Sequence, residues 1–124
     1  LLIRRLMRKN PGKKMELNPG IGLPSPKRTI SDEEVLKRLV YTMVNEASRC
    51  LDEKVANEAG AVDIGMIKGT GFPPFHAGLL RYAEHVGLQN IVEDLNRFSK
   101  ISSCQHLSPA PYLVRLAANG QTFY

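Results

Sequence analysis

The residues in this sequence that could bind a metal or act as a nucleophile include three histidines and two cysteines. Zinc sites need a close set of such ligands, as in HExxH or paired cysteines, and His76 and His85 stand nine residues apart with no such pattern around them. Cys104 precedes His106 by two residues, but residues so close in sequence rarely point toward one another as a nucleophile and its base must. We therefore expect no metal site and no catalytic residue here.

Glycine-rich loops that cradle phosphates are the next chemistry to consider. A dinucleotide site normally has GxGxxG between a strand and a helix. Gly69, Thr70 and Gly71 supply only the first half of that motif, and Pro74 stands where the third glycine should be. No stretch alternates polar and apolar residues convincingly, as a strand would. The sequence therefore predicts no Rossmann unit, and no cofactor bound by these residues.

The most distinctive window is 69–87, GTGFPPFHAGLLRYAEHVG, and it must contain a stiff bend. Its glycines end a helical pattern, and each proline fixes its own φ and disfavours the α region in the residue before it. Phe72 and Phe75 flank the two prolines, and rings of that size are poorly suited to water. We expect both rings to pin a rigid corner that sets the angle between two helices.

The pattern GxGFPPFHxG followed by LLRYAEHVG resembles the C-terminal domain of 3-hydroxyacyl-CoA dehydrogenases. It is most similar to the second of two such domains in the multifunctional fatty-acid oxidation protein, an enoyl-CoA hydratase/3-hydroxyacyl-CoA dehydrogenase. The similarity extends from about Ser31 to Tyr124. The residues that carry the motif, and that we expect at an interface, are Gly69, Gly71, Phe72, Pro73, Pro74, Phe75, His76, Gly78 and Arg81.

The resemblance implies a parent protein that oxidises (3S)-hydroxyacyl-CoA with NAD. In that parent the oxidation depends on a His/Glu pair in a nucleotide-binding domain. Residues 1–124 do not include such a domain. In the catalytic copy of the C-terminal domain, the first helix begins Asn-Arg and the Asn faces the active site, whereas the matching pair here is Lys37 and Arg38. The resemblance therefore points to a non-catalytic second copy, which forms a pseudo-dimer with the sister domain and supports the dehydrogenase site.

The implied partners are that sister C-terminal domain, the NAD-binding domain of the same chain and a thiolase subunit. Because the sequence begins at Leu1, we expect a piece of a longer protein, and an isolated piece is expected to form homodimers. The implied compartment is the cytoplasm in a bacterium, or mitochondria or peroxisomes in a eukaryote. The alternative interpretation is a module whose basic residues bind the phosphates of CoA or acyl-CoA.

The charge of the chain is divided unevenly. Residues 1–30 hold eight basic residues and one acid, and residues 31–124 hold nine basic and eleven acidic residues, so the net charge of +5 belongs to the N-terminal segment. A nucleic-acid-binding domain needs a basic face on its folded part, which disfavours that function. No apolar run approaches the roughly 18 residues of a membrane span. Cys50 and Cys104 are too few for a disulfide framework, and buried free thiols are expected.

Helices must position these features, and the sequence predicts an all-α domain of about five of them. Residues 1–30 are expected to be an irregular basic arm, in which Leu2, Ile3, Leu6 and Met7 have helical spacing and suit a small patch. From residue 10 onward, prolines and glycines predict an extended linker. Residues 31–124 are expected to form a compact bundle similar to the C-terminal domain of 6-phosphogluconate dehydrogenase.

The first helix is the clearest, because Ser31 and Glu34 make a capping box ahead of an apolar stripe of about five turns. The residues expected to face the core along it are Val35, Leu36, Leu39, Val40, Met43, Val44, Ala47, Cys50 and Leu51.

Four more helices are expected after the first. Their ranges are about 57–68, 77–85 and 88–99, and a last one that begins with Ser108 as N-cap and ends at residues 119–120. Gly60 and Gly65 are poor helix formers, which suggests that another helix backbone crosses close by. Asp63 is expected to make local hydrogen bonds.

Overall fold

The computed structural model describes residues 29–102 and 105–124. Within those ranges the chain is all-α, with five α-helices, a π-helical turn and two short 3₁₀ turns, which confirms the predicted fold class. The predicted arm, 1–30, lies almost wholly outside the described residues, as does Cys104. Cys50 is a free thiol, but it is only partly buried.

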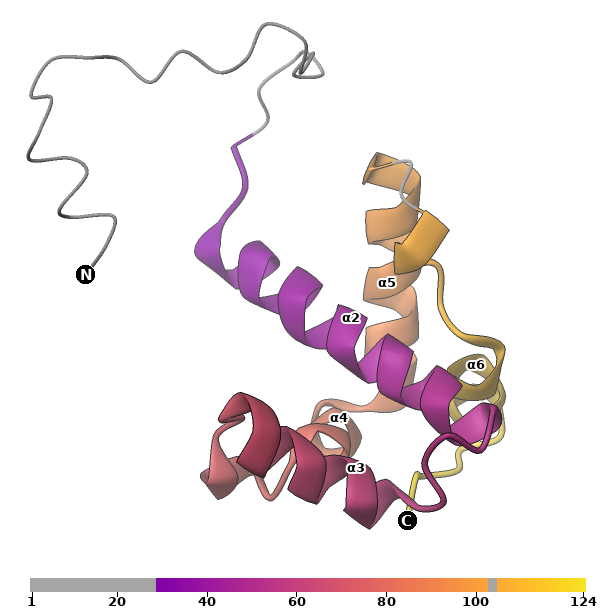
Figure 1. The fold of residues 1–124 in the computed structure, drawn as a ribbon. Coiled ribbons are helices and arrows are strands. Elements are labelled where there is room, and N and C mark those ends of the chain that lie inside the picture. The colour runs from indigo at the N-terminus through magenta and orange to yellow at the C-terminus, as the bar shows by residue number, and fades with distance from the viewer. Residues whose placement is uncertain (1–28, 103–104) are drawn as a thin grey trace, which may run out of the picture.

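Helix α2, Asp32–Asp52, runs obliquely across the molecule and is its longest element (Figure 1). At its start the Ser31 hydroxyl accepts a hydrogen bond from the Glu34 backbone N–H at 3.2 Å, which confirms the predicted N-cap. Three acidic residues in the first turn suit the positive end of the helix dipole. With 21 residues the helix is about 32 Å long, so α4, α5 and α6 can all pack along it.

The next three helices follow closely on one another. Helix α3, Ala59–Gly65, continues into a π-helical turn at Met66–Thr70, and α4 spans Leu79–Val86. Gly87, with φ of 94°, closes α4 and leads directly into α5, Leu88–Ser102. The buried face of α5 consists of apolar residues at helical spacing: Leu88, Ile91, Val92, Leu95 and Phe98.

Helix α6, Pro111–Ala118, begins two residues later than the predicted N-cap at Ser108 implied. Ala110 is the N-cap and Pro111 the first helical residue, because a residue before proline favours extended backbone and Ala110 has ψ of 139°. The start is shifted because Asn45 of α2 holds the preceding segment in place. Its side-chain amide accepts from the Ala110 N–H at 2.6 Å and donates to the Ser108 carbonyl at 2.8 Å.

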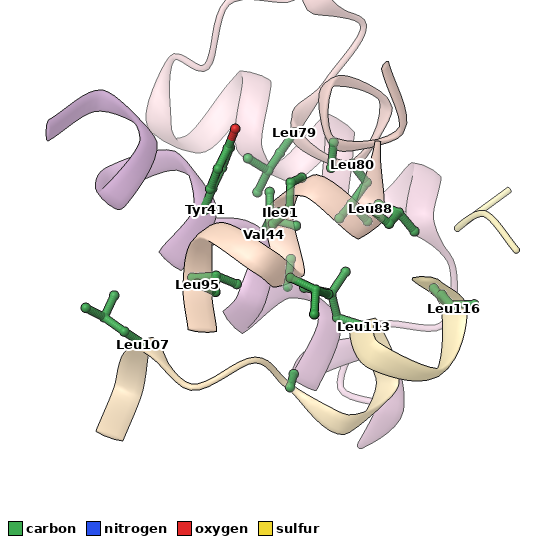
Figure 2. Packing of buried hydrophobic residues seen from close by; sticks show 14 of the residues in the cluster. Tyr41, Val44, Leu79, Leu80, Leu88, Ile91, Leu95, Leu107, Leu113 and Leu116 are labelled. Carbon is green, nitrogen blue, oxygen red and sulfur yellow. The ribbon is translucent and has the colours of Figure 1, made fainter. Parts of the chain in front are cut away.

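The core lies where α2, α4, α5 and α6 meet (Figure 2). Figure 2 shows Val44 of α2 beside Ile91, with Leu79, Leu80 and Leu88 on one side and Leu113 on another. The fully buried side chains are Val44, Asn45, Ser48, Leu79, Leu80, Ile91, Leu95, Phe98 and Leu113. Asn45 is thus a polar residue within an apolar interior, and its hydrogen bonds satisfy it there.

The predicted core stripe of α2 is wrong on one side. Leu36 and Leu39 are 58% and 62% exposed, whereas Tyr41 and Ser48, which were not predicted, are buried. Apolar residues cover more than half of the helix circumference, but the neighbouring helices cover only the side centred on Val44. The Ser48 hydroxyl can be buried because it donates to the Val44 carbonyl at 2.8 Å.

The predicted close crossing at Gly60 and Gly65 is also wrong. A Cβ added at either position would meet nothing within 4 Å among the described residues.

None of the helices that the structure describes combines the length and the apolar character of a membrane span.

The buried amide of Asn45 gives a first prediction. Replacing it with alanine leaves the buried Ala110 N–H without its acceptor, and the Ser108 carbonyl keeps only its hydrogen bond from Arg49 at 3.2 Å. We therefore expect the free energy of unfolding to fall by about 2–3 kcal/mol. Urea denaturation measures the change. Asn96→Ala, on the exposed face of α5, is the control and should cost less than about 0.5 kcal/mol. Equal losses in the two variants would contradict the role assigned to Asn45.

Candidate functional site

The start of α4 is capped from another helix. Asp63 of α3 is buried, and its Oδ1 accepts a hydrogen bond from the Leu80 N–H at 2.6 Å. Its Oδ2 accepts from the Arg81 N–H at 3.2 Å. These are two of the amide groups that the first turn of a helix leaves without an internal partner. The prediction of local hydrogen bonding for Asp63 is wrong, because its partners are 17 and 18 residues away.

Gly78 makes this approach between α3 and α4 feasible. It has no side chain with which to cap α4 itself, and its φ of 119° is one that other residues rarely adopt. A Cβ on Gly78 would also collide with Cβ and Cγ of Asp63. The glycine of the motif is therefore required both by its backbone angle and by the carboxylate packed against it.

The C-terminal residues close over the same carboxylate. The Tyr124 hydroxyl donates to Asp63 Oδ2 at 2.7 Å, and Glu84 Oε1 accepts from the Phe123 and Tyr124 N–H groups at 2.7 and 3.2 Å. The Arg81 guanidinium lies 3.4 Å from the centroid of the Tyr124 ring, a cation–π contact. Burial and the hydrogen bond to Asp63 raise the pKa of Tyr124 to about 12. The tail is thus held against α3 by the Asp63 carboxylate and against α4 by Glu84 and Arg81.

The corner between α3 and α4 contains a cluster of aromatic rings. Phe72 is buried, and its centroid is 6.3 Å from that of Tyr82 on α4. The His76 ring lies 5.0 Å from Tyr82 and 4.5 Å from Phe75. Among the described residues, the ring contacts of His76 are with Phe72, Phe75 and Tyr82.

Phe75 corrects the prediction that both phenylalanines pin the corner, because it is 81% exposed. Pro74–His76 forms a 3₁₀ turn, in which successive side chains project about 120° apart. His76 turns toward Tyr82, and Phe75 is left on the outer side of the turn. Phe72 alone anchors the corner to the core.

The backbone of the corner is held on both sides of Phe75. The Ala77 N–H donates to the Pro74 carbonyl at 2.9 Å, and Ala77 has φ of 59°, in the left-handed region. Gly71, with φ of 74°, ends the π-helical turn before the prolines. Asp63 holds the start of α4, which follows the turn. The exposed Phe75 ring therefore lies on a turn whose flanking segments are both held in place.

The predicted motif residues thus do different things. Arg81 holds the tail, and Phe75 and His76 form the outer surface of the corner. The residues that shape the corner itself are Gly71, Phe72, Pro73, Pro74 and Gly78. Gly69 is exposed, and a Cβ there would meet no described atom within 4 Å. Local patterns indicate little about the roles of Asp63, Glu84 and the aromatic tail, because the partners of these residues are distant in the chain.

Reactive groups do not gather at this corner. No group of three histidine, cysteine, aspartate or glutamate residues able to hold a metal occurs in ranges 29–102 and 105–124. A hollow of about 430 Å³ lies between the start of α3 and the C-terminal tail. Its lining includes Glu58, Tyr112 and Phe123 but no lysine or arginine, so it does not suit an anionic ligand. The corner between α3 and α4 can therefore fix the angle between the two helices and expose Phe75 to a partner.

The contact between Gly78 and Asp63 predicts opposite effects for two glycines. Gly78→Ala should lower the free energy of unfolding by about 2 kcal/mol, through the collision with Asp63 and the positive φ. Gly60→Ala, in open space on α3, should raise it by about 0.5 kcal/mol, because alanine loses less backbone entropy. Urea denaturation of both variants is the measurement. A Gly78→Ala variant as stable as Gly60→Ala would show that the carboxylate does not occupy this position.

The raised pKa of Tyr124 predicts a loss of stability at high pH. In the unfolded chain a tyrosine titrates near pH 10, as a model compound does, while in the folded chain its pKa is about 12. The stabilisation from the neutral hydroxyl is therefore fully present below pH 10 and is lost as the pH rises toward 12. Tyr124→Phe should remove this pH dependence. Tyrosinate absorbance and unfolding free energies of both proteins between pH 9 and 12 test it.

Comparison with known proteins agrees with the family resemblance that the motif at residues 69–87 indicated. The family model for the 3-hydroxyacyl-CoA dehydrogenase C-terminal domain matches residues 35–122. A protein of Colwellia psychrerythraea named fatty acid oxidation complex subunit alpha is 36% identical over 98 residues, which cover 79% of this chain and 13% of that protein. Proteins of the same name from Vibrio parahaemolyticus and Vibrio vulnificus are each 38% identical, over 116 and 100 residues.

Those two alignments cover 91% and 81% of this chain but only 16% and 14% of the relatives. The chain thus spans a small part of the length of these curated relatives, each of which contains much more polypeptide. The match includes the corner and helices α3 to α6, and it ends at Thr122, just before Phe123 and Tyr124. The chain belongs to the family of 3-hydroxyacyl-CoA dehydrogenase C-terminal domains.

Proposed function

We propose that this chain is a non-catalytic domain of a longer fatty-acid oxidation protein, and that it supports the dehydrogenase site from outside. The parent oxidises 3-hydroxyacyl-CoA with NAD and also carries enoyl-CoA hydratase activity. The relatives are several times longer than this chain and are named fatty acid oxidation complex subunit alpha. The reactive groups and the NAD site belong to other domains of that parent, which resides in the cytoplasm of a bacterium.

The observation that carries this proposal is the exposed ring of Phe75. A phenylalanine 81% exposed at the tip of a constrained turn has the properties of an interface anchor, since large rigid apolar side chains dominate binding energy at protein interfaces. Little conformational entropy is lost when such a ring is covered, because Ala77 and the prolines already fix the turn. The partner that we assign to it is the sister C-terminal domain, with the NAD-binding domain and a thiolase subunit beyond it.

The charge distribution disfavours the alternative of a module that binds CoA phosphates. The arginines whose ion pairs are described bind carboxylates of this chain: Arg38 to Glu34, Arg49 to Glu46, Arg81 to Glu84, Arg97 to Asp94 and Arg115 to Asp52. A phosphate would have to compete with these carboxylates. This pattern favours the structural role.

The role of Phe75 is tested in the full-length parent. Phe75→Asp should lower 3-hydroxyacyl-CoA dehydrogenase activity about tenfold, because the charge prevents the domain from docking and the catalytic domains lose their support. The isolated domain should keep its melting temperature, since the ring is outside the core. Hydride transfer from NADH to acetoacetyl-CoA is the assay.

Val55→Asp is the matched control, because Val55 is 74% exposed but lies in the connection between α2 and α3. The control should retain full activity. Unchanged activity in Phe75→Asp would contradict the assigned interface. Micromolar binding of acyl-CoA to the isolated chain would support the CoA-binding alternative, whereas self-association that Phe75→Asp abolishes would support docking through the corner.

A further inference from the structure

A second apolar surface remains open on α2, on the side away from the core. Val35, Leu36 and Leu39 are 44%, 58% and 62% exposed, and we call these three residues the outer face of α2. Their spacing of one and four residues places them on one stripe of the helix. Met43, one turn further along, is partly buried and continues the stripe toward the body of the domain. Among the described residues, nothing buries these side chains.

The charges on this side of α2 are acidic. Asp32, Leu39 and Glu46 are spaced seven residues apart, so they share one line along the helix. Both acids are exposed, although Glu46 also pairs with Arg49.

The cations in the N-terminal half of α2 point elsewhere. Lys37 binds Asp94 of α5 at 3.5 Å, and the Arg38 guanidinium lies 4.8 Å from the Phe98 ring centroid, also on α5. A complementary cover for the outer face of α2 is therefore an apolar segment flanked by basic residues.

This chain contains such a segment at 1–9, outside the described residues. Its sequence is LLIRRLMRK, and Leu2, Ile3 and Leu6 repeat the spacing of Val35, Leu36 and Leu39. Its four basic residues alternate with these apolar positions, as in an amphipathic helix with a basic polar side. The two surfaces match in period and in apolar character, and their charges are opposite in sign.

The intervening chain is long enough for the two to meet. Residues 10–28 comprise 19 residues, and an extended chain of that length spans at most about 60 Å. Helix α2 is about 32 Å long, so the segment can reach any point along it. A tether of this length keeps the effective concentration of the segment in the millimolar range, so even weak complementarity gives binding within the chain.

We propose that residues 1–9 bind to the outer face of α2 of the same chain. Leu2, Ile3 and Leu6 contact Leu36 and Leu39, and the arginines lie toward Asp32 and Glu46. The polypeptide that enters the domain is then fastened to it at a defined place. This contact is separate from the Phe75 corner, so either proposal can fail without the other.

Limited proteolysis of the whole chain with trypsin tests the contact. Docked residues resist cleavage, so Leu39→Asp should speed cleavage after Arg4, Arg5 and Arg8 about tenfold, in proportion to the undocked population. Ile64→Asp is the matched control, because Ile64 of α3 is 59% exposed and lies on another helix. The control should be cleaved at the wild-type rate.

Raising the salt concentration should also speed cleavage of the wild-type chain, because the contact includes opposite charges. Equal cleavage rates in the wild type and Leu39→Asp would overturn the proposal. Protection that disappears on dilution would assign the outer face of α2 to a second copy. Protection seen only in the full-length parent would assign it to another domain, and either result would also overturn the proposal.

Discussion

The buried carboxylate of Asp63 is the group on which the arrangement of α3, α4 and the C-terminal tail depends. A charge in an apolar interior is strongly unfavourable unless hydrogen bonds replace its lost hydration. Asp63 receives two backbone amides from the first turn of α4 and one phenol from Tyr124. The positive end of the α4 dipole adds to this stabilisation. Each partner therefore has one position in which it satisfies the carboxylate, and that requirement fixes where the three segments lie relative to one another.

Asn45 positions the segment before α6, as Asp63 positions the start of α4. Both are short polar side chains that bind backbone groups far away in sequence, 63 and 65 residues away for Asn45 and 17 and 18 for Asp63. The helices pack through leucine and other apolar contacts that tolerate sliding, whereas a buried hydrogen bond does not. The apolar core supplies most of the stability, and these two residues select one arrangement of the helices.

This division explains what the sequence could predict. Helical periods and caps are local, so α2, α4 and α5 were expected near their observed positions, and the all-α class followed from them. The start of α6 depends on Asn45, and the role of Asp63 depends on Tyr124, 61 residues away. No local pattern contains that information. Likewise, the apolar circumference of α2 was visible in the sequence, but the side that its neighbours cover was not.

The two phenylalanines of the corner show most clearly where the prediction from residue type fails. Phe72 and Phe75 are chemically identical and three residues apart, yet one is buried and the other is 81% exposed. Leaving such a ring in water forgoes about 2 kcal/mol, and a left-handed alanine costs about 1 kcal/mol more.

Losses of this size are a considerable part of the total stability of a domain, which is about 5–15 kcal/mol. The hydrogen bonds of Asp63 offset the backbone cost at Ala77, because they hold the helix that follows the turn. They do nothing to cover the ring. Among the described residues the corner is therefore determined in every respect except the burial of Phe75, and that exposed ring is the feature on which the proposed interface rests.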